Sequence, residues 1–348
     1  MPKRSPAMEL DQAITALLAT PGAFVDAPGA GKADGARRAK ISAEVSQLLT
    51  LVRDLRAMPR PEFKVALKSE LHRRSFMSQA AAKIEKQTAS FRPPNFRNIA
   101  PYFLVEDAPK FIEFLVSGLG GRETGRYLRP DGKVMHAAVA IGDSMIELGD
   151  ANEQYQPRAM GVHLYVDDCD ATYARALELG ATALAPLADQ HWGDRWGAVR
   201  DPFGNTWYIA TPKTYDPAQY GLVSVQPYMN LRGAHKMISF AEAALGARGL
   251  GVKEGPDGKI LHATVEIAGS TFELSDAQGG HEASSPFYLH VYVPDTDALY
   301  AQAVAAGAKG KTAPYTAPYG ERSATIEDPF GNTWFLATYL GPQAEVSQ

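Results

Sequence analysis

Short apolar runs and amphipathic stretches alternate along the chain from residue 99 onward. Residues 101–105 and 135–141 are short and mostly apolar, which predicts buried strands. Between them, residues 108–119 repeat apolar side chains at helical spacing and end at two glycines, which predicts a helix and its end. The order of strand, helix and two or three strands returns over residues 162–209. The hydrophobic pattern therefore predicts a βαβββ unit that is used twice.

A longer repeat duplicates this whole arrangement. Asp201-Pro202-Phe203-Gly204-Asn205 returns as Asp328-Pro329-Phe330-Gly331-Asn332, and the turn at residues 130–133 returns at residues 256–259. The offset is 126 positions before a single inserted residue and 127 after it, which indicates two copies of one fold. We predict an α+β protein with two tandem domains, residues 98–213 and 222–340, each a pair of βαβββ units. Its strongly curved mixed sheets are expected to form a pseudo-dimer with two clefts.

Residues 1–97 have no counterpart in the repeats. Apolar side chains recur at helical spacing within residues 10–18, 41–55 and 63–76, and the sequence Phe91-Arg92-Pro93-Pro94-Asn95 interrupts this pattern. The segment is therefore predicted to be helical and to end in a linker. We interpret its many Lys and Arg side chains as a solvated helix face. A nucleic-acid site is the alternative for these side chains, and an arm for a protein partner or for self-association is a further hypothesis for the segment.

Composition narrows the class of partner. The formal net charge of the 348 residues is −4, so no overall positive field favours nucleic acid or an anionic membrane. The apolar runs are far shorter than the roughly 20 residues that span a bilayer. A single cysteine, Cys169, and an N-terminus without a signal-like layout predict a reducing, cytoplasmic setting. The expected ligand is a small molecule.

The motifs resemble a known family. Those of the first repeat are Pro101-Tyr102, Pro130-Asp131-Gly132-Lys133, Gly142-Asp143-Ser144, residues 163–168, Trp192-Gly193-Asp194-Arg195 and Asp201-Pro202-Phe203-Gly204-Asn205. This set is similar to the PhnB-like branch of the vicinal oxygen chelate superfamily, which includes glyoxalases, bleomycin-resistance proteins and extradiol dioxygenases. The likeness covers about residues 99–340. It implies paired βαβββ units that curl into a cleft, and in catalytic members a divalent metal held by four strands.

The resemblance also implies candidate catalytic residues. In the first copy, Glu147 falls on one ligand position, and His163 lies on the right strand two residues beyond the usual ligand. Tyr102 and Tyr208 stand where His or Gln and the closing Glu are expected. The second copy has Tyr228, Glu273, His290 and Phe335 at these places. Neither copy holds the full set of metal ligands.

An incomplete set leaves two interpretations of the metal. His136, Glu147 and His163 in the first copy, or His262, Glu273 and His290 in the second, could bind Zn, Fe, Mn or Ni together with water. Alternatively, these side chains are hydrogen-bond partners of one another and of Tyr102 or Tyr228, and no metal is bound. We favour the second interpretation because a phenol rarely replaces a metal ligand.

Aromatic residues and paired arginines are the remaining signals. Trp207 and Trp334 recur at one place in the fold, which favours a role in the core. Trp192 and Trp196 have no tryptophan counterpart in the second copy and are candidates for the cavity wall. The recurring arginines at 195 and 322 each follow a carboxylate and are expected to form structural ion pairs.

Two classes of function remain open. One is a lyase, isomerase or oxygenase acting on a small oxygenated metabolite, with Glu147 or His163 as base or ligand. The other is a metal-free protein that sequesters or senses an aromatic compound, as drug-resistance relatives do, with residues 1–97 as a docking arm. The first copy is expected to be the more active one because it has Tyr208, a hydroxyl, where the second has Phe335.

Overall fold

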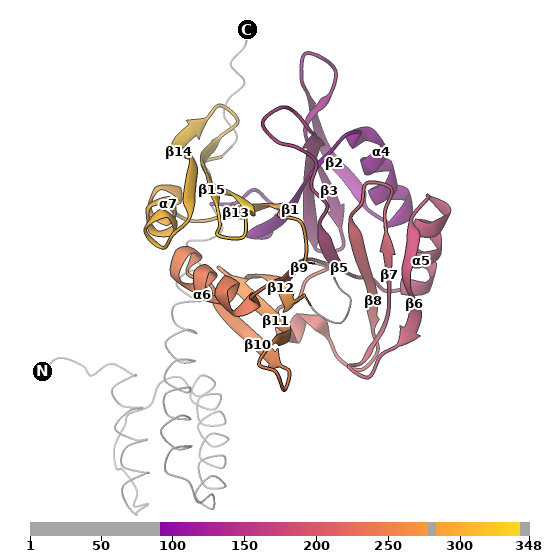
Figure 1. The fold of residues 1–348 in the computed structure, drawn as a ribbon. Coiled ribbons are helices and arrows are strands. Elements are labelled where there is room, and N and C mark those ends of the chain that lie inside the picture. Colours follow the sequence, from indigo (N-terminus) through magenta and orange to yellow (C-terminus); the bar gives the residue numbers. More distant parts are fainter. Residues whose placement is uncertain (1–90, 278–282, 342–348) are drawn as a thin grey trace, which may run out of the picture. The chain divides into compact units, whose positions relative to one another are not determined.

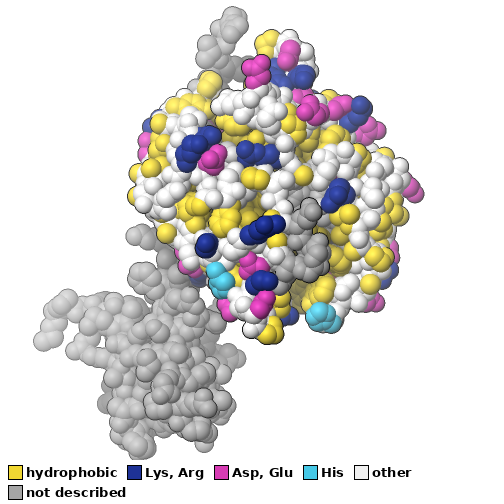
Figure 2. Space-filling model, viewed as in Figure 1, with side chains coloured by type: hydrophobic (Ala, Val, Ile, Leu, Met, Phe, Trp, Pro, Cys, Tyr) yellow, Lys and Arg dark blue, Asp and Glu magenta, His cyan; other side chains and the backbone are white. Residues whose placement is uncertain are grey.

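The computed structural model describes residues 91–277 and 283–341. All of them belong to one compact unit, Ser78–Gln348, and a second unit comprises Met1–Met77. The predicted helical segment therefore lies almost wholly outside the described residues. Among the described helices, none is long and apolar enough to cross a membrane. On the face shown in Figure 2, Lys and Arg side chains are spread among acidic and apolar ones.

Four βαβββ units follow one another along the chain (Figure 1). The first unit contains β1 (Ile99–Val105), α4 (Ala108–Glu113) continued by the π-helical turn η1 (Phe114–Gly118), β2 (Arg122–Leu128), β3 (Val134–Ile141) and β4 (Ser144–Asp150). The second contains β5 (Gly161–Tyr165), α5 (Cys169–Glu178), β6 (Thr182–Asp189), β7 (Asp194–Arg200) and β8 (Thr206–Pro212). The first copy is thus a pair of such units, as predicted.

The second copy repeats this order after the short 3-10 helix η2 (Pro217–Tyr220). Its first unit, the third of the chain, contains β9 (Val225–Leu231), α6 (Ala234–Leu245), β10 (Arg248–Glu254), β11 (Ile260–Ile267) and β12 (Ser270–Asp276). The fourth unit contains β13 (Tyr288–Tyr292), α7 (Thr296–Ala305), β14 (Lys309–Ala317), β15 (Glu321–Glu327) and β16 (Thr333–Tyr339).

The strands form two eight-stranded sheets, and each sheet takes one unit from each copy. Sheet 1 has the order β14-β15-β16-β13-β1-β4-β3-β2, and sheet 2 has the order β10-β11-β12-β9-β5-β8-β7-β6. Antiparallel pairing joins the copies in each sheet, with Tyr102 opposite Tyr288 in sheet 1 and Gly161 opposite Tyr228 in sheet 2. The first unit therefore continues into the fourth, and the second into the third.

The hydrophobic core is one cluster that contains residues of both copies, and two of its aromatic pairs lie within a copy. Phe103 on β1 stacks on Trp207 on β8 with ring centroids 5.9 Å apart, and Phe272 on β12 meets Trp334 on β16 at 5.8 Å. Both tryptophans are fully buried, which confirms their predicted core role. Figure 1 shows α4 and α5 on one side of the described region, and α6 and α7 on the other. Each copy is thus a packed domain, and the tandem α+β architecture is confirmed.

The repeated Asp-Pro-Phe-Gly-Asn stretch is a structural turn. Asp201 Oδ1 accepts hydrogen bonds from the backbone N–H groups of Phe203 and Asn205, both at 2.9 Å. Its Oδ2 accepts from the Asn205 amide at 2.9 Å and from the buried indole of Trp207 at 2.8 Å. Asp328 makes the same four bonds in the second copy. The turn closes the last hairpin of each copy and anchors its core tryptophan.

Candidate functional site

Strand pairing across the copies decides which predicted residues meet. Neighbouring strands of sheet 1 place Tyr102 beside Glu147, and His290 beside Phe335. Sheet 2 does the same for Tyr228 with Glu273 and for His163 with Tyr208. The predicted grouping by copy is therefore wrong: His163 lies with Glu273, and His290 lies with Glu147. The reason is that β1 pairs with β13 and β5 pairs with β9.

Site 1 is a polar network on sheet 1, made of Glu147, His136, His290, Tyr292 and Glu321. The Glu147 carboxylate has His136 Nε2 at 3.2 Å from Oε1 and His290 Nδ1 at 2.7 Å from Oε2. The Tyr292 hydroxyl lies 3.3 Å from Glu147 Oε1 and 3.4 Å from Glu321 Oε1. His290 Nε2 is 3.8 Å from Glu321 Oε2. His290 is thus placed between two buried carboxylates.

Burial and charge act in opposite directions on the groups of site 1. Burial alone raises the pKa of Glu147, but the nearby His290 and His136 outweigh it and hold that pKa at about 2. Burial lowers the pKa of His290, whereas the charges of Glu147 and Glu321 raise it. The effect of the two carboxylates is the larger one, so the net shift of this pKa is upward. Burial together with the Glu147 charge raises the pKa of Glu321 against the opposing effect of His290. The favoured state is a His290 cation paired with an ionised Glu147.

Site 2 is the corresponding group on sheet 2, made of Glu273, His262 and His163, with the Tyr165 ring 4.3 Å from the His163 ring. His262 Nε2 lies 3.2 Å from Glu273 Oε1, and His163 Nδ1 lies 2.9 Å from Oε2. Burial raises the pKa of Glu273, but His163 and His262 outweigh it and hold that pKa at about 2. The carboxylate–imidazole arrangement of site 1 is therefore repeated.

The two sites differ at the carboxylate that corresponds to Glu321, the residue near Nε2 of His290 in site 1. Asp194 occupies the position of Glu321 but is one methylene shorter, and its Oδ2 accepts from the Trp192 indole at 3.1 Å. Within the described residues, the buried atoms His163 Nε2 and Asp194 Oδ1 have no hydrogen-bond partner. Site 2 thus keeps an imidazole nitrogen that its own carboxylates do not engage.

Aromatic rings line both sites. Around site 1, the Phe335 ring is 5.2 Å from Tyr102 and 5.5 Å from Tyr155, and it stacks on Tyr288 at 5.9 Å. At site 2, Trp196 stacks on Tyr208 at 6.0 Å, and Tyr208 lies 5.1 Å from Tyr228. Trp192, which is 47% exposed, meets Trp196 edge-on at 6.2 Å. The predicted wall residues Trp192 and Trp196 therefore belong to site 2.

The donor set does not fit the four-ligand metal site that the resemblance implies. Tyr102 and Phe335 occupy two of the four positions in site 1, and Tyr228 and Tyr208 occupy the same positions in site 2. In each site the two imidazoles approach different oxygens of one carboxylate, so both carboxylate oxygens have a protein partner without an ion. Among the described residues, no three His, Cys, Asp or Glu side chains form a metal-holding group.

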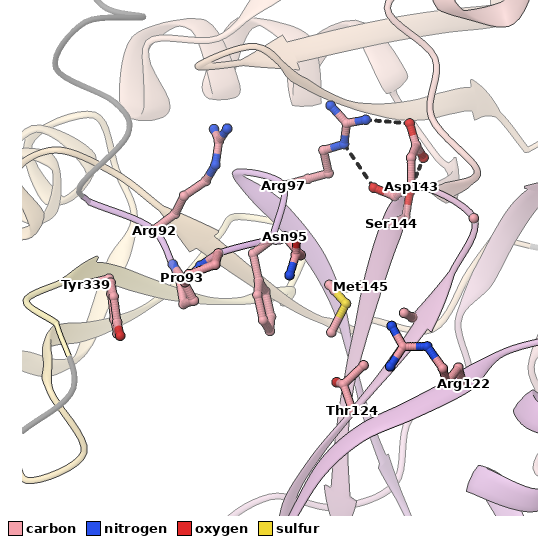
Figure 3. A pocket seen from close by; sticks show the side chains of 14 residues that line it. Arg92, Pro93, Asn95, Arg97, Arg122, Thr124, Asp143, Ser144, Met145 and Tyr339 are labelled. Carbon is pink, nitrogen blue, oxygen red and sulfur yellow. Dashed lines mark hydrogen bonds and ion pairs between the residues drawn. The ribbon is translucent and has the colours of Figure 1, made fainter.

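A cavity of about 760 Å³ opens on sheet 1 beside site 1 (Figure 3). It is lined by residues 92–97 of the linker and by the ends of β2, β3 and β4. Ala140 and Met145 line it, and side chains alternate along a strand, so they share the sheet face that carries His136 and Glu147. This size is typical of sites for small organic molecules.

Several residues of the sites were missed by sequence reasoning. Tyr292 and Tyr165 lie two positions after the site histidines, so the period of two in a strand could have placed them on the same face. Glu321 and Asp194 were considered only as ion-pair partners of the arginines that follow them. Those arginines instead pair across to helix residues, Arg195 with Asp170 and Arg322 with Asp297. Adjacent strand residues point to opposite faces, which frees the carboxylates for the sites.

Comparison with known proteins gives the class of this chain. Residues 99–209 and 228–336 match the Glyoxalase/Bleomycin resistance protein/Dioxygenase superfamily. These matches cover more than half of the chain, one in each copy, so the chain belongs to this superfamily with two tandem domains.

Particular relatives agree with the class and leave the activity open. One is an uncharacterized protein of Mycobacterium bovis, 39% identical over 125 residues that span 33% of this chain and 82% of that protein. An uncharacterized protein of Mycobacterium tuberculosis is also 39% identical over 125 residues, or 74% of its length. Glyoxalase I from Zea mays superimposes with a TM-score of 0.53 at 17% identity, covering 69% of this chain and 92% of that chain. That likeness shows a shared fold.

Proposed function

We propose that this chain is a metal-free binding protein for a small oxygenated or aromatic molecule. The observation that carries the proposal is the composition of the ligand positions. Each sheet presents one ionised glutamate, held by two imidazoles, among aromatic rings that stand where further metal ligands would be required. Such rings supply flat apolar surface, and the carboxylate–imidazole network supplies a fixed polar anchor. The cavity beside site 1 is the proposed entry for the ligand.

The test separates ligand binding from metal binding. The full chain is purified without chelator, its Zn, Fe, Mn and Ni contents are measured, and its melting temperature is recorded with and without each metal. We expect substoichiometric metal and no thermal shift with metal, together with a shift for some members of a panel of small aromatic acids, alcohols and ketones. Stoichiometric metal, or a shift with metal alone, contradicts the metal-free form of the proposal.

A second candidate is an enzyme of the lyase, isomerase or oxygenase class. It is favoured by the His290 imidazole, which lies between two carboxylates and has a raised pKa, an arrangement suited to proton transfer. Turnover of a bound ligand, or exchange of its carbon-bound hydrogen in deuterated water that is lost in His290→Gln, would favour this candidate. The PhnB-like affiliation, a drug-resistance or sensing role, a cytoplasmic location and a docking role for residues 1–97 stay proposals of the same kind.

A further inference from the structure

Three arginines line the cavity beside site 1. They are Arg92 and Arg97 from the linker and Arg122 from the start of β2, and Figure 3 shows their side chains around the same hollow as Met145 and Tyr339. Arg97 is paired with Asp143, the acidic residue of the lining. Arg92 donates to the neutral amide of Asn98 at 2.8 Å, which leaves its charge in place. The lining therefore has an excess of positive charge.

The duplicated strand shows how Arg122 differs from its counterpart. Arg122 faces Ala140 across the β2–β3 pair, and Arg248 faces Glu266 across the equivalent β10–β11 pair. Arg248 Nη2 lies 2.5 Å from the Glu266 carboxylate. At the first position the acid is replaced by alanine, and no carboxylate of the described residues pairs with Arg122. The same arginine is neutralised in one sheet and left with a free guanidinium in the other.

Apolar surface stands beside this charge. Phe96, Met145 and Tyr339 contribute to the lining, and the Phe96 ring also packs edge-on against Tyr292 of site 1 at 5.6 Å. A guanidinium next to apolar and aromatic walls suits an anionic group that is attached to an apolar body.

We propose that the cavity beside site 1 binds a small organic anion, with a carboxylate or phosphate on an apolar body, and that Arg122 pairs with the anionic group. This inference rests on the proposed binding function and adds the charge of the ligand. The apolar body lies against Phe96, Met145 and Tyr339. Glu266 performs in sheet 2 the neutralising role that the ligand performs in sheet 1.

The experiment uses the full chain and probes matched in shape. Binding of benzoate, phenyl phosphate and neutral benzyl alcohol is measured by calorimetry for the wild type and for Arg122→Gln, Ala140→Glu and Arg248→Gln. Ala140→Glu rebuilds at the first position the ion pair of the second, and Arg248→Gln is the matched control in sheet 2. Circular dichroism and melting temperature confirm that each variant is folded.

We expect the anions to bind more tightly than benzyl alcohol, with an affinity that falls as salt rises. Arg122→Gln and Ala140→Glu should each weaken the anions by about tenfold, the loss expected for one charge-assisted pair. Benzyl alcohol should change by less than about twofold in these variants, and Arg248→Gln should leave all three probes unchanged.

Two other kinds of result would contradict the anion site alone or the anion site together with the proposed binding function. If benzyl alcohol binds as tightly as benzoate, or if Arg248→Gln costs as much as Arg122→Gln, the anion inference is wrong while the binding function stands. If none of the probes binds to the wild type at millimolar concentration, both the anion site and the proposed binding function for aromatic ligands of this size are contradicted.

Discussion

Sites 1 and 2 share a glutamate with two imidazoles. They differ in what lies near the second ring nitrogen of His290 and of His163. Both place one glutamate between two imidazoles. In site 1 the longer Glu321 reaches towards His290, whereas in site 2 the shorter Asp194 pairs with Trp192 and leaves His163 Nε2 without a partner among the described residues. The second imidazole nitrogen therefore has a carboxylate at 3.8 Å in site 1, too far for a hydrogen bond, and no partner among the described residues in site 2.

The two sheets also differ in the residue that faces the corresponding arginine, Arg122 in sheet 1 and Arg248 in sheet 2. Sheet 1 has Ala140 where sheet 2 has Glu266, so no carboxylate of the described residues pairs with Arg122, while His290 Nε2 lies 3.8 Å from Glu321. Sheet 2 has a paired arginine and a free imidazole nitrogen. The carboxylate–imidazole network is thus retained in both sites. The group that is left for a ligand is an arginine in sheet 1 and an imidazole nitrogen in sheet 2.

Replacement of His290 or His163 should give the largest difference in stability between the two sites. His290→Ala leaves the buried Glu147 and Glu321 facing each other without the cation between them, which we expect to cost about 4 kcal/mol of unfolding free energy. His163→Ala strands only Glu273 and should cost about 2 kcal/mol. Urea unfolding of the full chain measures both. Equal losses would mean that Glu321 does not contribute to the network.

Acid should destabilise both sites. The folded pKa of about 2 for Glu147 and Glu273 lies below the ordinary value of 4.5, so the stabilisation is present above about pH 4.5 and is lost as the pH falls towards 2. The loss amounts to about 3 kcal/mol for each carboxylate.

Unfolding measured between pH 6 and pH 2.5 tests this effect. Glu147→Gln and Glu273→Gln should each remove the part of the acid-dependent loss that comes from the substituted carboxylate, whereas the other carboxylates with lowered pKa values keep theirs. The raised pKa of Glu321 opposes it in site 1, because protonation of that carboxylate at low pH relieves first the cost of its burial and then its repulsion with Glu147. Site 1 should therefore lose slightly less than site 2, and the reverse order would contradict the description of Glu321.

The turns outside the sites provide a matched reference. Asp201→Ala and Asp328→Ala each remove the same four hydrogen bonds and leave a buried indole N–H unpaired. We expect both to cost about 2 kcal/mol or more, with equal values because the two turns are identical. Chemical denaturation tests this equality. A clear difference would show that the copies differ in their scaffold as well as in their sites.

Substitution of Glu321 by glutamine should have the smallest effect and the most specific one. The nearby Glu147 and Glu321 charges raise the pKa of His290 against the effect of burial, so loss of one of them should lower that pKa. NMR titration of the His290 side chain measures the change. Asp194→Asn, in the other sheet, is the control and should leave the His290 pKa where it is.

Local sequence patterns predicted the framework because they depend on neighbours in the chain. The turns, the core roles of Trp207 and Trp334 and the two copies followed from spacing alone. The resemblance put Glu147 on a ligand position, and its carboxylate contacts His136 and His290 in the structure. These features are set by interactions over short separations.

The partners of Glu147 and Glu273 could not be predicted in the same way. His290 is 143 residues from Glu147, and His163 is 110 residues from Glu273, so their contacts depend on which strands pair between the copies. Sequence spacing fits pairing within a copy and pairing across copies equally well. The expectation of a more active first copy stays a prediction, and it now concerns two sites that each draw residues from both copies.

The pairing of β1 with β13 and of β5 with β9 has a consequence for inheritance. Each half of the gene encodes part of both sites, so a mutation in either half meets selection through a network completed by the other half. Neither half can lose its contribution while the other preserves a complete site. Positions 194 and 321 hold different acids, and a change at either one alters one site and leaves its counterpart intact.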